Sequence, residues 1–297
     1  FRVSLGVYAG LWTISITLRS NTTRRLAYLC IAAITLMAWM YPRHKIIDMS
    51  LSMIIVASLT YLLLSPYTKR YFFLGVIVGL AAVFGRNHGV YAAVASLIAM
   101  GWLAIKSPTP ENRLTGAAAW AAGVVVGYLP VLAMCLFIPG YFTAFVDTIV
   151  FMLEQGNTNL PLPIPWPWTV GFGTAGVVIE TRWFLIGLCF MGLIVFGSGA
   201  LAWVFKERIK GRAVPSGLVA VACATLPYAH YAFARADVGH LAQGIYPLLL
   251  GIFITLGTLH SETLKWALAL LTSVVSLFIL PLGNPGSLLA PKTDGPR

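Results

Sequence analysis

An arginine, an aspartate and a histidine lie close together in segment 235–240, RADVGH. Asp237 and His240 are three residues apart, so on a helix that begins near Asp237 both side chains project toward one side. Free backbone N–H groups at such a helix end favour an anionic ligand, and Arg235 can grip a phosphate with two hydrogen bonds. We therefore take Asp237 as a candidate catalytic residue, with Arg235 and His240 as substrate-binding residues. The alternative is structural: Asp237 caps the helix and pairs with Arg235, and His240 is interfacial.

A second mixed group, Arg43, His44, Lys45 and Asp48, opens a long apolar segment. Asp48 comes three residues after Lys45 and four after His44, which is about one helical turn into that segment. A lone aspartate at mid-membrane depth costs about 2.5–3.5 kcal/mol, and less near the interface, so Asp48 should pair with Lys45 or face a wet cavity. Two interpretations stay open. The group is either a structural ion pair, or a phosphate-binding site with Asp48 as a further candidate catalytic residue.

A third group, Arg86, Asn87 and His88, is flanked by Gly85 and Gly89. The two glycines allow a ligand to approach the backbone closely, or simply permit a sharp turn. We treat the three polar residues as candidate substrate-binding residues. In the structural alternative Asn87 caps a helix and Arg86 extends toward lipid headgroups.

Composition places these groups in a membrane protein. Of 297 residues, 59% are hydrophobic and 10% are charged, far below the roughly 25% charged residues of soluble domains. Apolar runs long enough to cross a bilayer, about 20 residues each, fill nearly the whole chain between short polar connections. The predicted fold is therefore all-α: one polytopic transmembrane bundle over residues 1–297, with about ten helices. The predicted membrane helices are 2–18, 26–41, 46–64, 71–85, 89–105, 114–138, 183–204, 215–232, 241–259 and 264–280.

The basic residues are distributed unevenly between the two sets of connections. Twelve of the 20 lysines and arginines fall in odd-numbered connections, six in the N-terminal stretch and even-numbered connections, and two in the C-terminal tail. By the positive-inside rule the odd connections are cytoplasmic, and all three mixed groups lie outside. The formal net charge of +11 is scattered rather than stacked on one face, so nucleic acid is not a predicted partner.

The longest connection, 139–182, is predicted to lie outside and to have two parts. Segment 141–155 is apolar except for Thr143, Asp147 and Glu154, whose spacing puts them on one face of a helix lying on the membrane surface. Glu154 is a candidate substrate-binding residue, although a solvated helix face is the simpler interpretation. Segment 160–168, LPLPIPWPW, cannot be helical and should be extended and stiff, with tryptophans as interfacial anchors.

Other chemistries have no sequence support. The four cysteines sit in apolar segments, distant from one another and from histidines, so neither a disulfide framework nor a metal site is predicted. We find no phosphate-binding loop, dinucleotide fingerprint or nucleophile elbow, and no cofactor is implied. The chain begins with Phe1 rather than Met and has no signal peptide pattern, so we expect it to be part of a longer protein.

The short-looped helices, the surface helix and the groups RNHG at 86–89 and RADVGH at 235–240 together resemble the C-type (GT-C fold) membrane glycosyltransferases. The resemblance covers most of the chain in layout, but only those two stretches in sequence. The resemblance implies an inverting transfer of a sugar from a polyprenyl-phosphate carrier to a lipid, glycan or protein acceptor on the outer side of the membrane. We expect this membrane to be the bacterial inner membrane. Arg235, Arg86 and the group 43–45 would hold the carrier phosphate, with membrane lipid as the other partner.

In that family a carboxylate in the first external loop acts as general base on the acceptor. Here that loop would precede Phe1, so the role of general base cannot be carried over to a residue of this sequence. We take Asp237 as the stand-in for the base. Asp237 or Asp48 could also orient the acceptor. We expect Arg235, Asp237, His240, Arg86 and Arg43 to line one external cavity.

Three alternatives remain open. A lipid-linked oligosaccharide ligase or polymerase would also use external arginines and histidines. A lipid or solute transporter would show polar groups at mid-membrane depth in broken helices. A non-catalytic scaffold would need no convergence of Arg, His and Asp.

Overall fold

The computed structural model describes residues 2–18, 22–106, 110–155 and 162–280. In these residues the chain forms helices joined by turns and loops, and no strand. The helices are α1 (Arg2–Ser15), α2 (Thr22–Ala38), the 3-10 helix η1 (Arg43–Lys45), α3 (Ile46–Leu64), α4 (Thr68–Phe84), α5 (Arg86–Ala104), α6 (Pro110–Phe137), α7 (Tyr141–Gln155), α8 (Val177–Lys210), α9 (Ser216–Phe233), α10 (Val238–Gly244), α11 (Tyr246–Gly257) and α12 (Glu262–Ile279). The all-α prediction is confirmed.

Every segment predicted as a membrane helix is helical in the structure, with one correction. The predicted helix 241–259 is two helices, α10 and α11, which are bent by 57° relative to each other. The break has one local cause and one that depends on packing. Pro247 has no N–H to continue the hydrogen-bond ladder, and the backbone at Gly244 packs so closely on α9 that an added Cβ would lie 2.6 Å from the Tyr228 carbonyl oxygen.

Several helices are long and apolar enough to cross a membrane. Among the described residues there are four of these, α3, α8, α12 and the stretch Arg113–Phe137 of α6, and a fifth if α10 and α11 form one broken span. These helices indicate a multi-pass membrane protein. That all ten predicted segments cross a bilayer remains a prediction.

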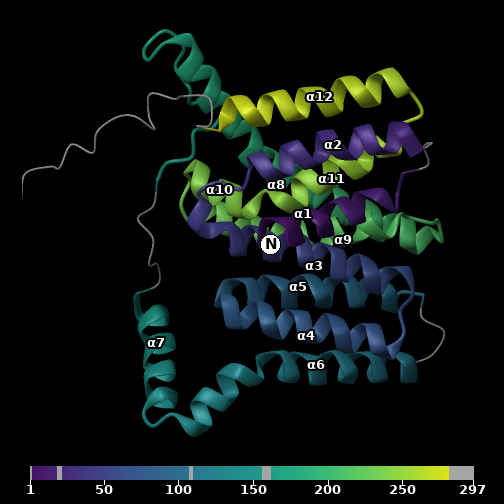
Figure 1. Cartoon of the computed structure of the whole chain (residues 1–297), viewed down its shortest axis with the longest axis vertical. Helices are drawn as coiled ribbons and strands as arrows, with labels where there is room; N and C mark the ends of the chain where they lie inside the picture. The colour runs from purple at the N-terminus through teal and green to yellow at the C-terminus, as the bar shows by residue number, and fades with distance from the viewer. Residues whose placement is uncertain (1, 19–21, 107–109, 156–161, 281–297) are drawn as a thin grey trace, which may run out of the picture.

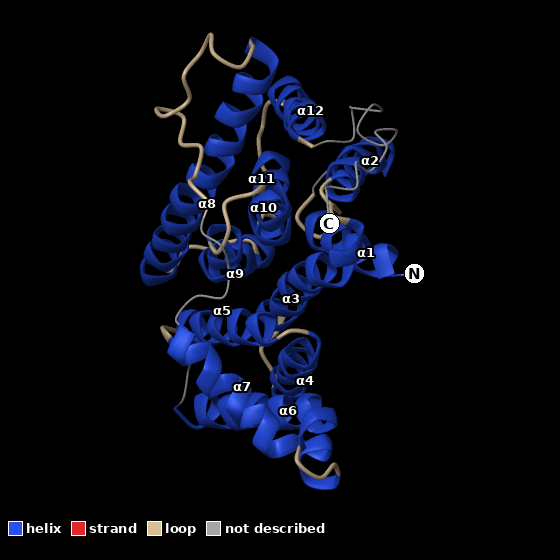
Figure 2. Cartoon of the chain, turned by 90° about the vertical axis from the view of Figure 1, so that its left-hand side faces the viewer, coloured by secondary structure: helices blue, strands red, loops and turns tan. Residues whose placement is uncertain are grey.

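Most helices lie side by side with nearly parallel axes, whereas α7 runs across their ends (Figure 1). Figure 2 views the bundle from the end at which α7 and α10 lie. Helices α3 and α9 occupy the centre. In the most apolar stretch of α3, 72% of the residues are buried. In that of α6 only 17% are buried, and its apolar side chains face outward, as contact with lipid requires.

Glycines allow α4 and α6 to pack backbone against backbone. A Cβ added at Gly79 would lie 2.3 Å from the Val124 carbonyl oxygen, and one at Gly123 would lie 2.2 Å from the Phe72 oxygen. Small residues four apart on facing helices are the usual means of close association in membranes. The α4–α6 pair therefore depends on the absence of side chains at these positions.

Candidate functional site

Asp237 organises the segment 235–240 as the sequence predicts. It is the N-cap of α10, and its Oδ1 accepts a hydrogen bond from the His240 backbone N–H at 2.8 Å. The same oxygen lies 3.1 Å from Nδ1 of the His240 ring, and Oδ2 lies 2.9 Å from Nε of Arg235. Both interactions of the structural alternative, the cap and the ion pair, are present. They also bring an imidazole and a guanidinium onto one carboxylate.

Asp48 forms a similar centre in the first turn of α3. Its carboxylate lies 3.4 Å from Nζ of Lys45, so the predicted pair with Lys45 is confirmed. Its other oxygen lies 3.7 Å from Nε2 of His88, which comes from the first turn of α5. The partnership of Asp48 with His88 was not predicted. It places the acid of one sequence group beside the histidine of another.

Tyr231, near the end of α9, joins the two carboxylate centres. Its ring stacks on His88 with centroids 5.4 Å apart, and lies 6.1 Å from the ring of His240. We call this assembly the polar cluster; its members are Lys45, Asp48, His88, Tyr231, Arg235, Asp237 and His240.

Several polar atoms at the cluster are buried without a hydrogen-bond partner. Nδ1 of His88, the hydroxyl of Tyr228 and Oε1 of Gln243 have none among the described residues, and Nε2 of His88 has only the 3.7 Å contact with Asp48, which is longer than a hydrogen bond. Neighbouring Tyr91 is satisfied, since its hydroxyl pairs with Nδ1 of His230 at 2.8 Å. Buried polar groups in folded proteins are nearly always hydrogen-bonded, and leaving one unpaired is costly. The unpaired atoms therefore point to water or a ligand that completes the site.

The cluster grades from a buried side to an exposed side. His88 is buried and the Asp48 side chain is 17% exposed, whereas those of Asp237, Lys45 and Arg235 are 32%, 41% and 43% exposed. A carboxylate beside an imidazole can accept and pass on a proton. The two exposed cations can meet an anionic group arriving from outside the cluster. The geometry thus suits proton transfer next to a bound phosphate.

The other predicted site residues lie elsewhere. Arg86 is exposed and lines a separate cavity of about 380 Å³ between α4, α5, α6 and α7, so the structure does not bring it to the polar cluster. The reason is helical geometry, because Arg86 and His88 are two residues apart on α5 and face different neighbours. Asn87 and His44 are exposed, and no side-chain cap is seen at the start of α5. The side chain of Arg43 lies outside the described residues.

The segment before α8 matches its prediction in part. Residues 162–166 form neither helix nor strand, and the Trp166 backbone N–H donates to the Ile164 carbonyl oxygen at 2.8 Å, so the predicted extended chain turns at this point. Trp166 and Trp168 stack with centroids 5.2 Å apart, whereas Leu160 and Pro161 lie outside the described residues. Glu154 is exposed on α7, which has no buried residues. None of the contacts described above for the polar cluster involves Glu154.

Glu180 was not predicted as a polar centre. It is buried, and its carboxylate accepts backbone N–H groups of Gly173, Thr174 and Ala175 at 2.9, 2.6 and 2.7 Å. A glycine-rich turn just before an acidic helix start is the signal that could have found it. Glu180 therefore fixes the connection rather than facing a ligand.

Among the described residues, no group of three or more His, Cys, Asp and Glu side chains could hold a metal ion. No family model matches the chain, and no curated protein or solved structure is significantly similar to it. The geometry of the polar cluster is therefore the basis for proposing a function.

Proposed function

We propose that this protein is a membrane glycosyltransferase that moves a sugar from a polyprenyl-phosphate carrier to a glycan, lipid or protein acceptor. The reaction takes place at the polar cluster, on the extracytoplasmic side of the membrane. One observation carries the proposal: two acid–histidine pairs, distant in sequence, meet through Tyr231 with cations beside both.

The cluster supplies the groups that an inverting transfer needs. A carboxylate, for which Asp237 is the stand-in, takes the proton of the acceptor hydroxyl while that oxygen bonds to the anomeric carbon. The bond between that carbon and the phosphate oxygen breaks, and the carrier leaves as polyprenyl phosphate. Arg235 stabilises the negative charge that grows on the leaving oxygen, and the partly exposed Lys45 helps to hold the carrier phosphate. In this scheme Asp48 orients the acceptor, with His88 as its buried partner.

The sidedness rests on the unequal basic connections. In this topology the bundle crosses the membrane ten times, with α10 and α11 as one broken span, and α7 lies on the outer surface. Twelve lysines and arginines then lie inside and six outside, apart from the tail.

Transfer by the full-length protein, reconstituted in liposomes with labelled polyprenyl-phosphate sugars and extracted acceptors, tests the chemistry. Asp237→Asn and Arg235→Gln should lower transfer by about 10²-fold or more, the range of a lost acid–base or charge-stabilising group. Lys210→Gln, at an exposed position of α8 outside the cluster, is the matched control. Normal transfer in both cluster variants would remove the cluster from the mechanism.

Cysteine labelling tests the topology separately. In a background without native cysteines, a membrane-impermeant maleimide should modify Asn87→Cys in intact cells. It should modify Lys210→Cys only after permeabilisation. Both positions are exposed, and they lie on α5 and α8 at opposite ends of the bundle. The reverse pattern would move the reaction to the cytoplasmic side.

A second candidate, a lipid or solute transporter, is favoured by one observation. The helix pair α10–α11 is broken, and the buried Gln243 beside the break has an amide oxygen without a partner. A transporter would move the labelled carrier across sealed proteoliposomes without a new glycosidic bond. Product analysis by mass distinguishes the two, because glycosyl transfer adds the mass of a sugar to the acceptor.

A further inference from the structure

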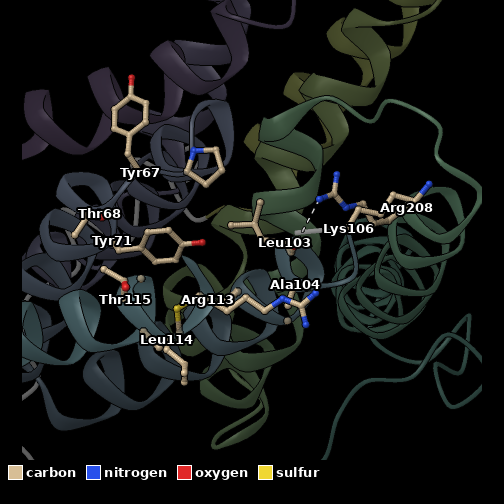
Figure 3. Close-up of a pocket in the computed structure, with 15 residues that line it drawn as sticks. Tyr67, Thr68, Tyr71, Leu103, Ala104, Lys106, Arg113, Leu114, Thr115 and Arg208 are labelled. Atoms are coloured by element: carbon tan, nitrogen blue, oxygen red, sulfur yellow. Dashed lines mark hydrogen bonds between the residues drawn. The ribbon is translucent and has the colours of Figure 1, made fainter. Parts of the chain in front are cut away.

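A cavity of about 700 Å³ lies at the end of the bundle opposite the polar cluster. It forms where the start of α4, the end of α5, the first turns of α6 and the end of α8 meet (Figure 3). Three cations line it: Lys106, Arg113 and Arg208. We call it the basic cavity. None of its described lining side chains is acidic.

Arg208 is held in place by groups that leave its charge uncompensated. Its guanidinium lies 4.3 Å above the Trp102 ring, and one terminal nitrogen donates to the Leu103 carbonyl oxygen at 3.2 Å. Its Nε is buried and has no hydrogen-bond partner. The acid next to it on α8, Glu207, pairs instead with Arg212 at 3.0 Å. A fixed cation with an unused donor is suited to an anion.

The surrounding side chains add both polar groups and apolar surface to the cavity. The amino group of Lys106 lies beside Gly211, at the end of α8. In Figure 3 the hydroxyl of Tyr71 and the guanidinium of Arg113 reach into the same space as Arg208. Leu103 and Leu114 supply apolar wall. A phosphate with attached hydrocarbon matches this combination.

The position of the cavity favours a lipid over a soluble anion. Helix α5 has 19 residues and is about 28 Å long; it carries His88 of the polar cluster in its first turn and Leu103 of the basic cavity in its last turn. That length is close to the thickness of the hydrocarbon core, so the two ends reach the two headgroup layers. Tyr67, which is exposed beside the cavity, is the residue type that marks such a layer.

From these observations we infer that the basic cavity binds the phosphodiester headgroup of an anionic membrane lipid. Arg208 and Lys106 contact the phosphate, and the acyl chains leave along the apolar walls. Basic pockets between membrane helices on the positively charged side bind anionic headgroups in this way. The inference is independent of the reaction proposed for the other end.

Thermal stability of the full-length protein in neutral detergent tests the site. Phosphatidylglycerol should raise the melting temperature in a saturable manner, and phosphatidylcholine should not. Lys106→Gln should weaken the apparent affinity for phosphatidylglycerol about fivefold, the usual contribution of one basic residue near an anionic surface. Lys210→Gln, on the same end but outside the cavity, should bind as wild type does.

Each further outcome decides the assignment. Equal stabilisation by both lipids, or equal affinity in Lys106→Gln and wild type, would overturn the site. Inorganic phosphate that stabilises as well as phosphatidylglycerol would replace the lipid with a soluble anion and overturn the lipid assignment. Arg208→Lys keeps the charge but loses the planar stack on Trp102, and should bind more weakly than wild type. Because Lys106 is exposed, its variant remains informative if Arg208 variants fold poorly.

Discussion

The two ends of the bundle carry charge in different ways. At the polar cluster each carboxylate has a histidine and a cation beside it: Asp48 with His88 and Lys45, and Asp237 with His240 and Arg235. At the basic cavity three cations share one space, and no acid is among the described lining residues. Acid–imidazole pairs can move protons, whereas a fixed cation without an acidic partner, as Arg208 is, can bind an anion. The contrast separates the end proposed for the reaction from the end proposed for lipid binding.

Asp48→Asn should produce the largest difference between the ends. The change removes the negative partner of the buried His88 and keeps the shape of the side chain. We expect transfer to fall about 10²-fold, as for the loss of a group that orients the acceptor, with normal membrane insertion. Lys206→Gln, an exposed change on α8 toward the other end, should leave transfer unchanged. Equal transfer activity in Asp48→Asn and Lys206→Gln would show that the polar cluster is not the end at which transfer occurs.

Local signals predicted much of the fold and half of the cluster. The apolar run 46–64 coincides with α3 and the amphipathic run 141–155 with α7, because length and periodicity are local properties. The cap by Asp237 is also local. The break before α11 was missed because Gly244 and Pro247 lie inside an apolar run. Only the packing of Gly244 on α9 shows that the chain must bend there.

The missing half of the cluster depends on contacts between distant segments. His88 on α5 and Tyr231 on α9 are distant in sequence, and their rings stack only when α5 packs on α9. No periodicity in either helix indicates that His88 faces Asp48 or that the ring of Tyr231 lies against both histidines. Glu180 was missed for a related reason, since its three backbone donors converge only when Gly173 takes a positive φ of 100°. Sequence located the groups but not their partners.

Gly79→Leu should damage both ends together and so test whether they are independent. Helix α4 carries Tyr71 at the basic cavity and leads through Gly85 into α5 and His88. Any side chain at Gly79 collides with the α6 backbone, and such overpacking costs about 2–3 kcal/mol. Detergent-solubilised protein should melt at a lower temperature, with weaker lipid binding and lower transfer. Gly199→Leu, where a Cβ meets nothing within 4 Å, should be tolerated. Loss at one end alone would show that α4 does not couple them.

Glu180→Gln should separate structural acids from reactive ones on the same side of the bundle. The substitution removes the charge that accepts three backbone N–H groups, so the connection 162–176 should loosen. We expect protease cleavage in this connection to become several-fold faster, with transfer reduced only modestly. Glu154→Gln on the exposed face of α7 should change neither property. A loss of transfer as large as that in Asp48→Asn, with the connection intact, would place Glu180 in the reactive site.

Lys45→Gln should have the smallest effect, because the Lys45–Asp48 pair is 3.4 Å long and its lysine is 41% exposed. Solvent screening limits such a pair to about 0.2–1 kcal/mol, so transfer should change less than about fivefold and less still in high salt. The kinetic constants then identify its role. A higher KM at unchanged kcat means that Lys45 binds the carrier phosphate, whereas a lower kcat means that it positions Asp48. A change beyond tenfold would show that Lys45 is desolvated when substrate binds. In that case the polar cluster, like the basic cavity, binds its anion with a cation whose charge is left uncompensated.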